Sequence, residues 1–257
     1  MKSLSKHIEF VQFQYPKEKR FLIAPVGSWN YDCADENSDV DTKAIVIPNL
    51  TDIVYNRCDS IDHIFPNEEH CSIADIRNFM KSIQKGNPQF IEVLFSDHIS
   101  CNLEMYGEEI HGLLHNREEI ARCNPKNTMR AFLGMADRNY QLCKNRTQED
   151  HANKWLYQLA RIEECMRKYL TGFSFGECLR TNKRDALLEI KNNHYSSELI
   201  LEEAEYYIKE CEKHHEAFIN FYEVRWVQVL VEEIVKSVLK KSLEQDKTSS
   251  YIHYIDS

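Results

Sequence analysis

The sequence has no Cys-x-x-Cys pair, few turn-forming residues and no long apolar run. Its nine cysteines are scattered over 257 residues, which argues against a structural zinc site or a dithiol redox motif. Seven glycines and six prolines are too few for a loop-rich or disordered chain. No apolar run approaches the roughly 20 residues that cross a bilayer. Together with the lack of a signal-peptide pattern, these absences predict a cytoplasmic protein with reduced thiols and no membrane partner.

The chain also lacks a long basic cluster. Its formal net charge is −9, and the nearest approach to a basic run is residues 17–20. A nucleic-acid partner would therefore need a basic patch assembled by the fold. Hydrophobic residues make up 42% of the sequence, which is enough to bury a core in one large domain or two small ones.

The most informative stretch begins with an apolar run over residues 20–26 that ends at Gly27-Ser28. The run predicts a buried strand, with Pro25 marking an edge or a strand end. Gly27 and Ser28 then predict a turn or a short helix. Free backbone N–H groups and the helix dipole at such a point favour phosphate oxygens.

Two aspartates follow this turn. Residues 40–48 read as a second strand that ends at a proline, and Asp39 and Asp41 stand at its start. Side chains at i and i+2 of a strand leave the same face, about 7 Å apart at the backbone. Carboxylates held this close repel each other unless a cation lies between them, and magnesium prefers such oxygen ligands. The alternative is a solvated polar loop. The short distance to Gly27 and the entry into an apolar strand favour the metal site.

These motifs resemble a known family. Gly27-Ser28 followed by Asp39-Val40-Asp41 resembles the signature of the DNA polymerase β nucleotidyltransferase superfamily. The longer string Gly-Ser-x-Asn-Tyr…Asn-Ser-Asp-Val-Asp-Thr-Lys is similar to a bacterial and phage branch of predicted nucleotidyltransferases. Further similar blocks at residues 75–95 and 161–172 extend the resemblance over roughly residues 20–210. The resemblance implies an α+β fold, in which a small mixed sheet with flanking helices carries the metal site and a helical bundle forms the other wall of a cleft.

The hydrophobic pattern predicts a mixed α/β head over residues 1–100, a helical domain over 101–245 and a flexible tail over 246–257. In the head it predicts a third strand over 60–65, and helical spacing from Ile73 to Ile83. The helical segments expected after the head are 105–122, 125–144, 151–171, 182–192, 196–218 and 220–244. An apolar stripe follows the last segment: Val224, Val227, Val231, Ile234, Val235, Val238 and Leu239. It indicates packing within the bundle, and the alternative is a homodimer seam.

Three further side chains are candidates for nucleotide binding. Tyr31 could stack on a base, although a half-buried tyrosine is an equal alternative. Lys43, next to the aspartate pair but expected on the opposite face of the strand, could reach a phosphate, although a solvated lysine is the more common case. Arg161 could face the cleft and bind triphosphate, and the alternative is a helix-surface ion pair with Glu163 and Glu164.

The sequence departs from the branch at two places. The branch has a third carboxylate two positions after the Glu69-His70 equivalent, but Ser72 stands there. A serine hydroxyl is a poor magnesium ligand and no base at neutral pH. The acids that could replace it are Asp62, Glu68, Glu69 and Asp75. The second departure is Tyr157-Gln158, where the branch commonly has two histidines.

We therefore expect a nucleotidyltransferase that uses Mg²⁺ or Mn²⁺ to move a nucleoside monophosphate from an NTP, such as ATP, to an acceptor hydroxyl. Asp39 and Asp41 would be the catalytic metal ligands, and Gly27-Ser28 would hold the β- and γ-phosphates. The acceptor is left open between a tRNA end, a protein side chain and a small alcohol. The alternative is a binding or regulatory protein that keeps the fold but has lost turnover, which Ser72 favours. A toxin–antitoxin or phage-defence role is a third hypothesis.

Overall fold

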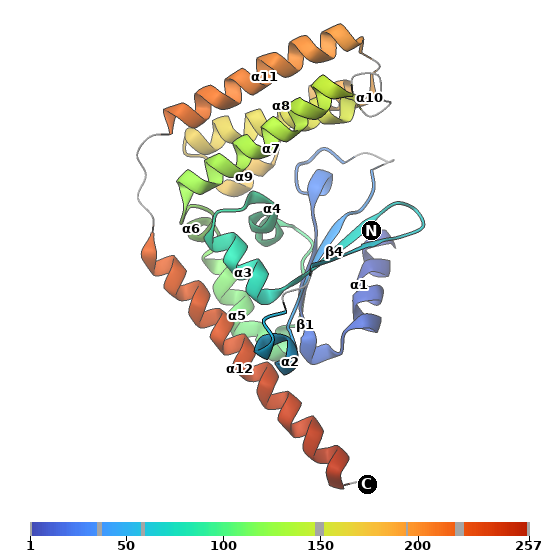
Figure 1. Ribbon diagram of the computed structural model, residues 1–257, viewed down its shortest axis with the longest axis vertical. Helices are drawn as coiled ribbons and strands as arrows, with labels where there is room; N and C mark the ends of the chain where they lie inside the picture. Colours follow the sequence, from blue (N-terminus) through green and yellow to red (C-terminus); the bar gives the residue numbers. More distant parts are fainter. Residues whose placement is uncertain are drawn as a thin grey trace.

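A five-stranded mixed sheet forms the centre of the N-terminal half in the computed structural model, which describes residues 2–34, 38–57, 60–146, 152–193, 195–218 and 224–255 (Figure 1). The strands are β1 (Arg20–Pro25), β2 (Thr42–Val46), β3 (Ser60–Ile64), β4 (His70–Asp75) and β5 (Ser100–Cys101), in the spatial order β3-β4-β2-β1-β5. The β2–β4 pair is parallel, whereas β1–β2, β1–β5 and β3–β4 are antiparallel. This small mixed sheet with flanking helices confirms the predicted α+β class.

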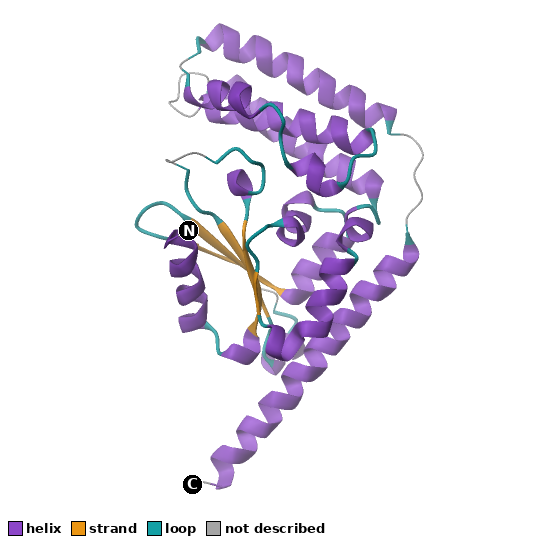
Figure 2. Cartoon of the chain, turned by 180° about the vertical axis from the view of Figure 1, so that it is seen from behind, coloured by secondary structure: helices purple, strands orange, loops and turns teal. Residues whose placement is uncertain are grey.

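Both faces of the sheet are covered. Helix α1 (Lys2–Gln14) packs on one face, where Val11 meets Ile23 and Ala44 in a small apolar cluster (Figures 1 and 2). Helix α3 (Ile76–Gln84) lies on the other face, where Phe79 joins the main core. The predicted strands over 20–26, 40–48 and 60–65 correspond to β1, β2 and β3.

Strand β4 corrects the sequence analysis. Ile73 lies on this strand, although its spacing predicted a helix from Ile73 to Ile83, and the helix begins only at Ile76. The reason is that Cys71 and Ile73 pack under α1 while Ala74 is buried on the opposite face. A strand buried on both faces shows no clear alternation. Asp75 then ends the strand and caps α3, because its carboxylate accepts the Arg77 N–H at 2.7 Å.

The remaining α-helices are α2 (Leu50–Val54), α4 (Pro88–Ile91), α5 (Leu103–His115), α6 (Arg117–Ala121), α7 (Pro125–Asn145), α8 (Ala152–Leu170), α9 (Phe175–Leu179), α10 (Arg184–Asn192), α11 (Ser197–Ala217) and α12 (Arg225–Ile255). Short 3₁₀ turns are η1 (Lys17–Lys19), η2 (Gly27–Trp29) and η3 (Glu92–Phe95). Helices α7, α8, α10 and α11 pack together beyond one end of the sheet (Figure 2). Their bounds match the predicted segments, whereas α9 was not predicted. No helix in the described ranges is long and apolar enough to cross a membrane.

Helix α12 runs along α3 and α5 on the side of the molecule (Figure 1). Its apolar stripe is buried within the chain, since Val227, Val231 and Val238 are fully covered. Glu109 of α5 fixes the helix by accepting hydrogen bonds from Ser237 and Lys241. The stripe therefore packs inside the molecule, as the first interpretation predicted, and it is not free to form a dimer seam. The helix continues to Ile255 through residues that the sequence predicted as a tail; residues 256–257 lie outside the described part.

A glycine joins the head to the helical region. Gly86 ends α3 with a positive φ of 73°, as its position past the helix end predicts. Asn87 then caps α4, and Pro88 occupies the first helical position. A Cβ at residue 86 would lie 2.4 Å from Thr128 Oγ1 of α7, so the backbone approaches α7 closely here. This contact sets the distance between the sheet and helix α7.

Candidate active site

The turn after β1 is hydrogen-bonded to the segment that carries the two aspartates. Gly27 has a positive φ of 72° and opens η2. On its near side, the Val26 N–H donates to the Asp41 carbonyl at 2.9 Å. On its far side, the Trp29 Nε1–H donates to the Asp39 carbonyl at 2.9 Å. The predicted phosphate turn and the predicted metal ligands are therefore held side by side.

The two aspartates differ in their surroundings. Asp39 is exposed, whereas Asp41 is half-buried and its Oδ1 accepts the His70 N–H at 3.0 Å. Asp41 directly precedes β2, so alternation places its side chain on the same face as Lys43, which corrects the expectation of opposite faces. Two carboxylates suit a Mg²⁺ ion that takes its other ligands from phosphates and water. Within the described ranges, no group of three or more histidine, cysteine or acidic side chains forms a metal-binding cluster.

The register of the sheet locates the missing third acid. Ser72 pairs with Lys43 across β2–β4 and with Asp62 across β3–β4, so these three side chains share one face of the sheet. Asp62 is exposed and lies one strand further out than Ser72. Its two-strand separation from β2 corresponds to roughly 10 Å. Asp62 therefore faces the correct side but does not take the place of a carboxylate at residue 72.

Of the other three acids that could replace it, two are engaged elsewhere and the third lies in a turn. Glu69 is buried and hydrogen-bonds His7. Asp75 forms an ion pair with Arg77 at the opposite end of β4. Glu68 lies between β3 and β4 with a positive φ of 66°.

A buried polar network on the α1 face of the sheet supports residues 39–41, called here the acid segment. His7 of α1 lies 2.7 Å from Thr42 Oγ1 through Nδ1, and 3.2 Å from Glu69 Oε2 through Nε2. The other Glu69 oxygen accepts the Val40 N–H at 3.3 Å. Burial lowers the pKa of His7, which favours the neutral ring with Nε2–H donating to Glu69 and Thr42 donating to Nδ1. Val40 and Thr42 flank Asp41, so this network holds the backbone on both sides of that aspartate. The sequence analysis missed His7, because nothing in the sequence pairs α1 with β2.

A cavity of about 430 Å³ opens between the sheet and helices α7 and α8. The head contributes Val26, Gly27, Tyr31, Lys43, Gln89 and Glu92, and the helices contribute Met135, Arg138, Asn139, Leu142, Trp155, Gln158, Arg161 and Ile162. The structure thus brings four of the predicted nucleotide-binding residues together: Gly27, Tyr31, Lys43 and Arg161. Ser28 lies in η2 beside Gly27 but does not line the cavity.

Glu92 connects the turn to the helical wall. Its Oε2 accepts the Tyr31 hydroxyl at 2.6 Å and the Gly27 N–H at 3.3 Å. The Arg161 guanidinium lies 3.7 Å from the centre of the Tyr31 ring. Burial, and secondarily Glu92, raises the pKa of Tyr31 well above its ordinary value, so the phenol remains a hydrogen-bond donor. Burial also raises the pKa of Glu92. The only sequence signal for Glu92 was an acid inside the apolar run 90–95.

Lys43 projects into the cavity from β2. Its Nζ lies 4.5 Å from the centre of the Phe90 ring, and burial lowers its pKa. The side chain is thus partly withdrawn from water, which increases its attraction for an anion in the cavity.

The family comparison bears on the same region. The profile of RlaP, the RNA repair pathway DNA polymerase beta family, matches residues 9–171, which is more than half of the chain. The chain belongs to the RlaP family. The match runs from α1 to the end of α8 and includes every residue that lines the cavity. No curated protein matches the chain.

Tyr157 and Gln158, where the branch commonly has two histidines, differ in their position relative to the cavity. Tyr157 is buried and does not line the cavity. Gln158 lines the cavity, and its Oε1 accepts the Arg161 Nε–H at 3.3 Å. Of these two positions, only Gln158 is placed to contact a ligand.

A basic rim borders the acid segment outside the RlaP match. The Arg184 Nη2 donates to the Ala34 carbonyl at 2.9 Å, and Lys191 Nζ donates to Ser38 Oγ at 3.3 Å. Arg180 pairs with Asp97 at 2.7 Å. These cations come from the α9–α10 region, and Asp32 and Asp185 lie within 4.0 Å of Arg180 and Arg184, so the rim combines cations with acidic side chains.

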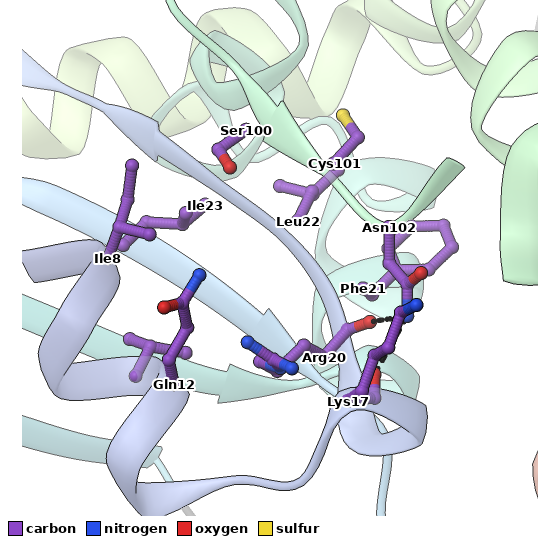
Figure 3. Close-up of a pocket in the computed structure, with 11 residues that line it drawn as sticks. Ile8, Gln12, Lys17, Arg20, Phe21, Leu22, Ile23, Ser100, Cys101 and Asn102 are labelled. Atoms are coloured by element: carbon purple, nitrogen blue, oxygen red, sulfur yellow. Dashed lines mark hydrogen bonds between the residues drawn. The ribbon is translucent and has the colours of Figure 1, made fainter. Parts of the chain in front are cut away.

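A second cavity, of about 250 Å³, lies between α1 and the β1–β5 edge (Figure 3). Arg20 and Lys17 line its polar part, and Ile8 and Ile23 its apolar part. No carboxylate lines it, and its α1 side is the face opposite Lys43. The features expected of an RlaP-family active site therefore belong to the larger cavity.

Proposed function

We propose that this chain transfers a nucleoside monophosphate from an NTP to a terminal hydroxyl of RNA in a magnesium-dependent reaction. One observation carries the proposal: hydrogen bonds join the Gly27 turn to the Asp39–Asp41 segment, and Gly27 and Lys43, on either side of that segment, line a cavity large enough for a nucleotide. In the reaction, the hydroxyl oxygen bonds to the α-phosphorus, the α–β bridging bond breaks, and pyrophosphate leaves.

Asp39 and Asp41 are the residues that would hold Mg²⁺, or Mn²⁺ in its place. Their oxygens, with those of the polyphosphate, are the donor set that such hard ions prefer. When bound, the ion activates the attacking oxygen and offsets the charge of the leaving group. The His70 N–H on Asp41 Oδ1 and the backbone bonds of Val40 keep this carboxylate in place.

The chain's own cations would bind the phosphates. Lys43 reaches the cavity from the strand that carries Asp41, and Arg138 faces it from α7. The Ser28 hydroxyl and the N–H groups of η2 would take further phosphate oxygens. Holding the α-phosphorus in line with the acceptor supplies the positioning on which phosphoryl transfer largely depends.

The RNA acceptor is proposed on two grounds. The matched family is described as acting in an RNA repair pathway. The rim formed by Arg180, Arg184 and Lys191 lies beside the Asp39–Asp41 segment and offers cations that could contact RNA phosphates, although Asp97 pairs with Arg180.

A second candidate is a protein that binds nucleotide without turning it over. The observation that favours it is Ser72, which occupies the face shared with Lys43 where a third carboxylate would stand.

The test compares wild type with Asp41→Asn in the presence of labelled NTPs, Mg²⁺ and RNA ending in a 3′-hydroxyl. Asp137→Asn, an exposed residue of α7, is the matched control. We expect Asp41→Asn to lose at least a hundredfold in label transfer while Asp137→Asn keeps wild-type activity. Equal transfer by wild type and Asp41→Asn would refute the proposal. Tight nucleotide binding with no transfer to RNA, protein or small alcohols would establish the second candidate.

A further inference from the structure

The two walls of the larger cavity differ in chemistry. The head side carries Lys43 and Gly27, which are groups for phosphates. The helical side carries an indole, two amides, aliphatic groups and two arginines, of which Arg161 already contacts the Tyr31 ring and Gln158. A nucleotide has the same polarity, with a charged polyphosphate at one end and a flat heterocycle at the other. Placing the phosphates at Lys43 therefore directs the base toward α7 and α8.

Trp155 offers the stacking surface on this wall. Its indole is partly buried, lines the cavity, and makes no hydrogen bond within the described ranges. Base stacking on an aromatic side chain contributes about 1–3 kcal/mol, which is roughly 5- to 150-fold in affinity. The stacking contribution grows with the overlapping ring area, so a purine gains more than a pyrimidine.

Two amides supply one donor and one acceptor. The Asn139 NH₂ donates to the Met135 carbonyl at 2.9 Å, which leaves Asn139 Oδ1 as an acceptor. Gln158 Oε1 accepts from Arg161 at 3.3 Å, which leaves the Gln158 NH₂ as a donor. Among the residues that the structure describes, no carboxylate of α7 or α8 lines the cavity, and Glu92 is the one carboxylate in the lining. Glu92 already accepts from Tyr31 and Gly27.

We infer that this wall selects adenine, with Trp155 stacking on the ring, Gln158 donating to N1 and Asn139 accepting from the 6-amino group. Guanine presents two adjacent donors, N1–H and the 2-amino group, and these would meet no free carboxylate. The inference deepens the proposed function and rests on it, since it assumes that the cavity holds the NTP substrate. It makes ATP the preferred substrate and Gln158 a specificity-determining residue.

The experiment measures calorimetric binding of non-hydrolysable analogues of ATP, GTP, CTP and UTP with Mg²⁺. We expect the ATP analogue to bind at least tenfold more tightly than the other three and to quench tryptophan fluorescence. Trp155→Phe should remove most of the quench while keeping a stacking ring. Trp155→Leu should weaken ATP-analogue binding by roughly 5- to 100-fold.

Variants of Gln158 and Asn139 test whether these two amides hydrogen-bond the edge of the base. Gln158→Leu and Asn139→Leu should each reduce the preference for the ATP analogue over the CTP analogue by about tenfold. Gln141→Leu, on the exposed side of α7, is the control and should change nothing. Circular dichroism and thermal unfolding would show that each variant folds.

The outcomes separate the two proposals. Equal binding of all four analogues, or tight binding that survives Trp155→Leu, would overturn the adenine inference and leave the transferase proposal standing. A stronger affinity for the GTP analogue would overturn it in the same way. Failure of every analogue to bind the wild-type protein would overturn both. Asp41→Asn should still bind the ATP analogue while losing transfer, which shows that binding and chemistry have been measured separately.

Discussion

Replacing His7 tests whether the network behind the sheet holds the acid segment. His7 is fully buried and contacts Thr42, the first residue of β2, and Glu69, the residue just before β4. Leucine fills a similar volume but makes no hydrogen bond. His7→Leu therefore leaves one Glu69 oxygen and the Thr42 hydroxyl without this partner, while the Val40 N–H still donates to the other Glu69 oxygen.

The expected loss follows from these contacts. Leaving a buried polar group without its partner typically costs about 1–3 kcal/mol and more for a charged group, so the loss of both His7 hydrogen bonds should cost about 3 kcal/mol. Adding Glu69→Met removes the carboxylate that has lost its His7 hydrogen bond, and it also removes the acceptor of the Val40 N–H. The double variant should therefore be about 1–2 kcal/mol less stable than wild type, and thus more stable than His7→Leu alone.

Urea unfolding of the four proteins of this cycle measures the coupling directly. His63→Leu is the matched control, because this histidine stacks on Phe10 at 4.0 Å on the same face, and it should lose only about 1 kcal/mol. Under conditions where His7→Leu is folded, its label transfer should fall about tenfold, because Asp41 lies between the two residues that the network holds. A loss below 1 kcal/mol for His7→Leu, or strictly additive effects, would refute the reasoning.

Three further predictions concern other parts of the molecule. Burial lowers the pKa of His7 below 6.5, against the opposing effects of Glu69 and Asp41, so this residue is protonated at a higher pH in the unfolded chain than in the folded protein. The free energy of unfolding should therefore decrease as the pH falls below about 6.5, and the decrease should be smaller in His7→Leu. Ser72→Asp adds a carboxylate on the face of Lys43 and should raise label transfer at limiting Mg²⁺ about tenfold; Ser60→Asp, at the far end of exposed β3, should not. Gly86→Ala combines a positive φ with a 2.4 Å clash, and thermal unfolding should show a loss of at least about 2 kcal/mol.

The sequence predicted the parts of the fold that depend on local pattern. The runs that form β1 and β2 are apolar and end in a glycine or a proline, and the caps at Asn87 and Pro88 are local signals. The sequence did not predict strand β4, because this strand is buried on both faces and is followed directly by the helix that Asp75 caps.

The candidate site was predictable where its residues are close in sequence or, as with Arg161, where a block of the family resemblance contains them. Gly27, Asp39 and Asp41 form a motif within 15 residues, and their types indicate phosphate and metal. The residues that support them come from distant segments: His7 lies 35 residues before Thr42, and Glu92 lies 61 residues after Tyr31. Which helix faces a strand depends on long-range packing, which no local pattern shows. The division into a head over 1–100 and a helical domain over 101–245 stays a prediction.

The Glu92 carboxylate affects how the cavity can bind phosphate. The Gly27 N–H, which the motif assigns to phosphate, donates instead to Glu92 at 3.3 Å, and a buried carboxylate repels a polyphosphate in the same cavity. At roughly 10 Å and an effective dielectric constant of about 20, that repulsion is about 1.5 kcal/mol, or roughly tenfold in Kd. Glu92→Gln keeps an oxygen for Tyr31 and Gly27 but removes the charge. Calorimetry should therefore show tighter ATP-analogue binding with unchanged folding. Weaker binding would mean that the Glu92 carboxylate itself contacts the substrate or its metal, and the phosphates would then have to lie nearer Lys43 than the turn.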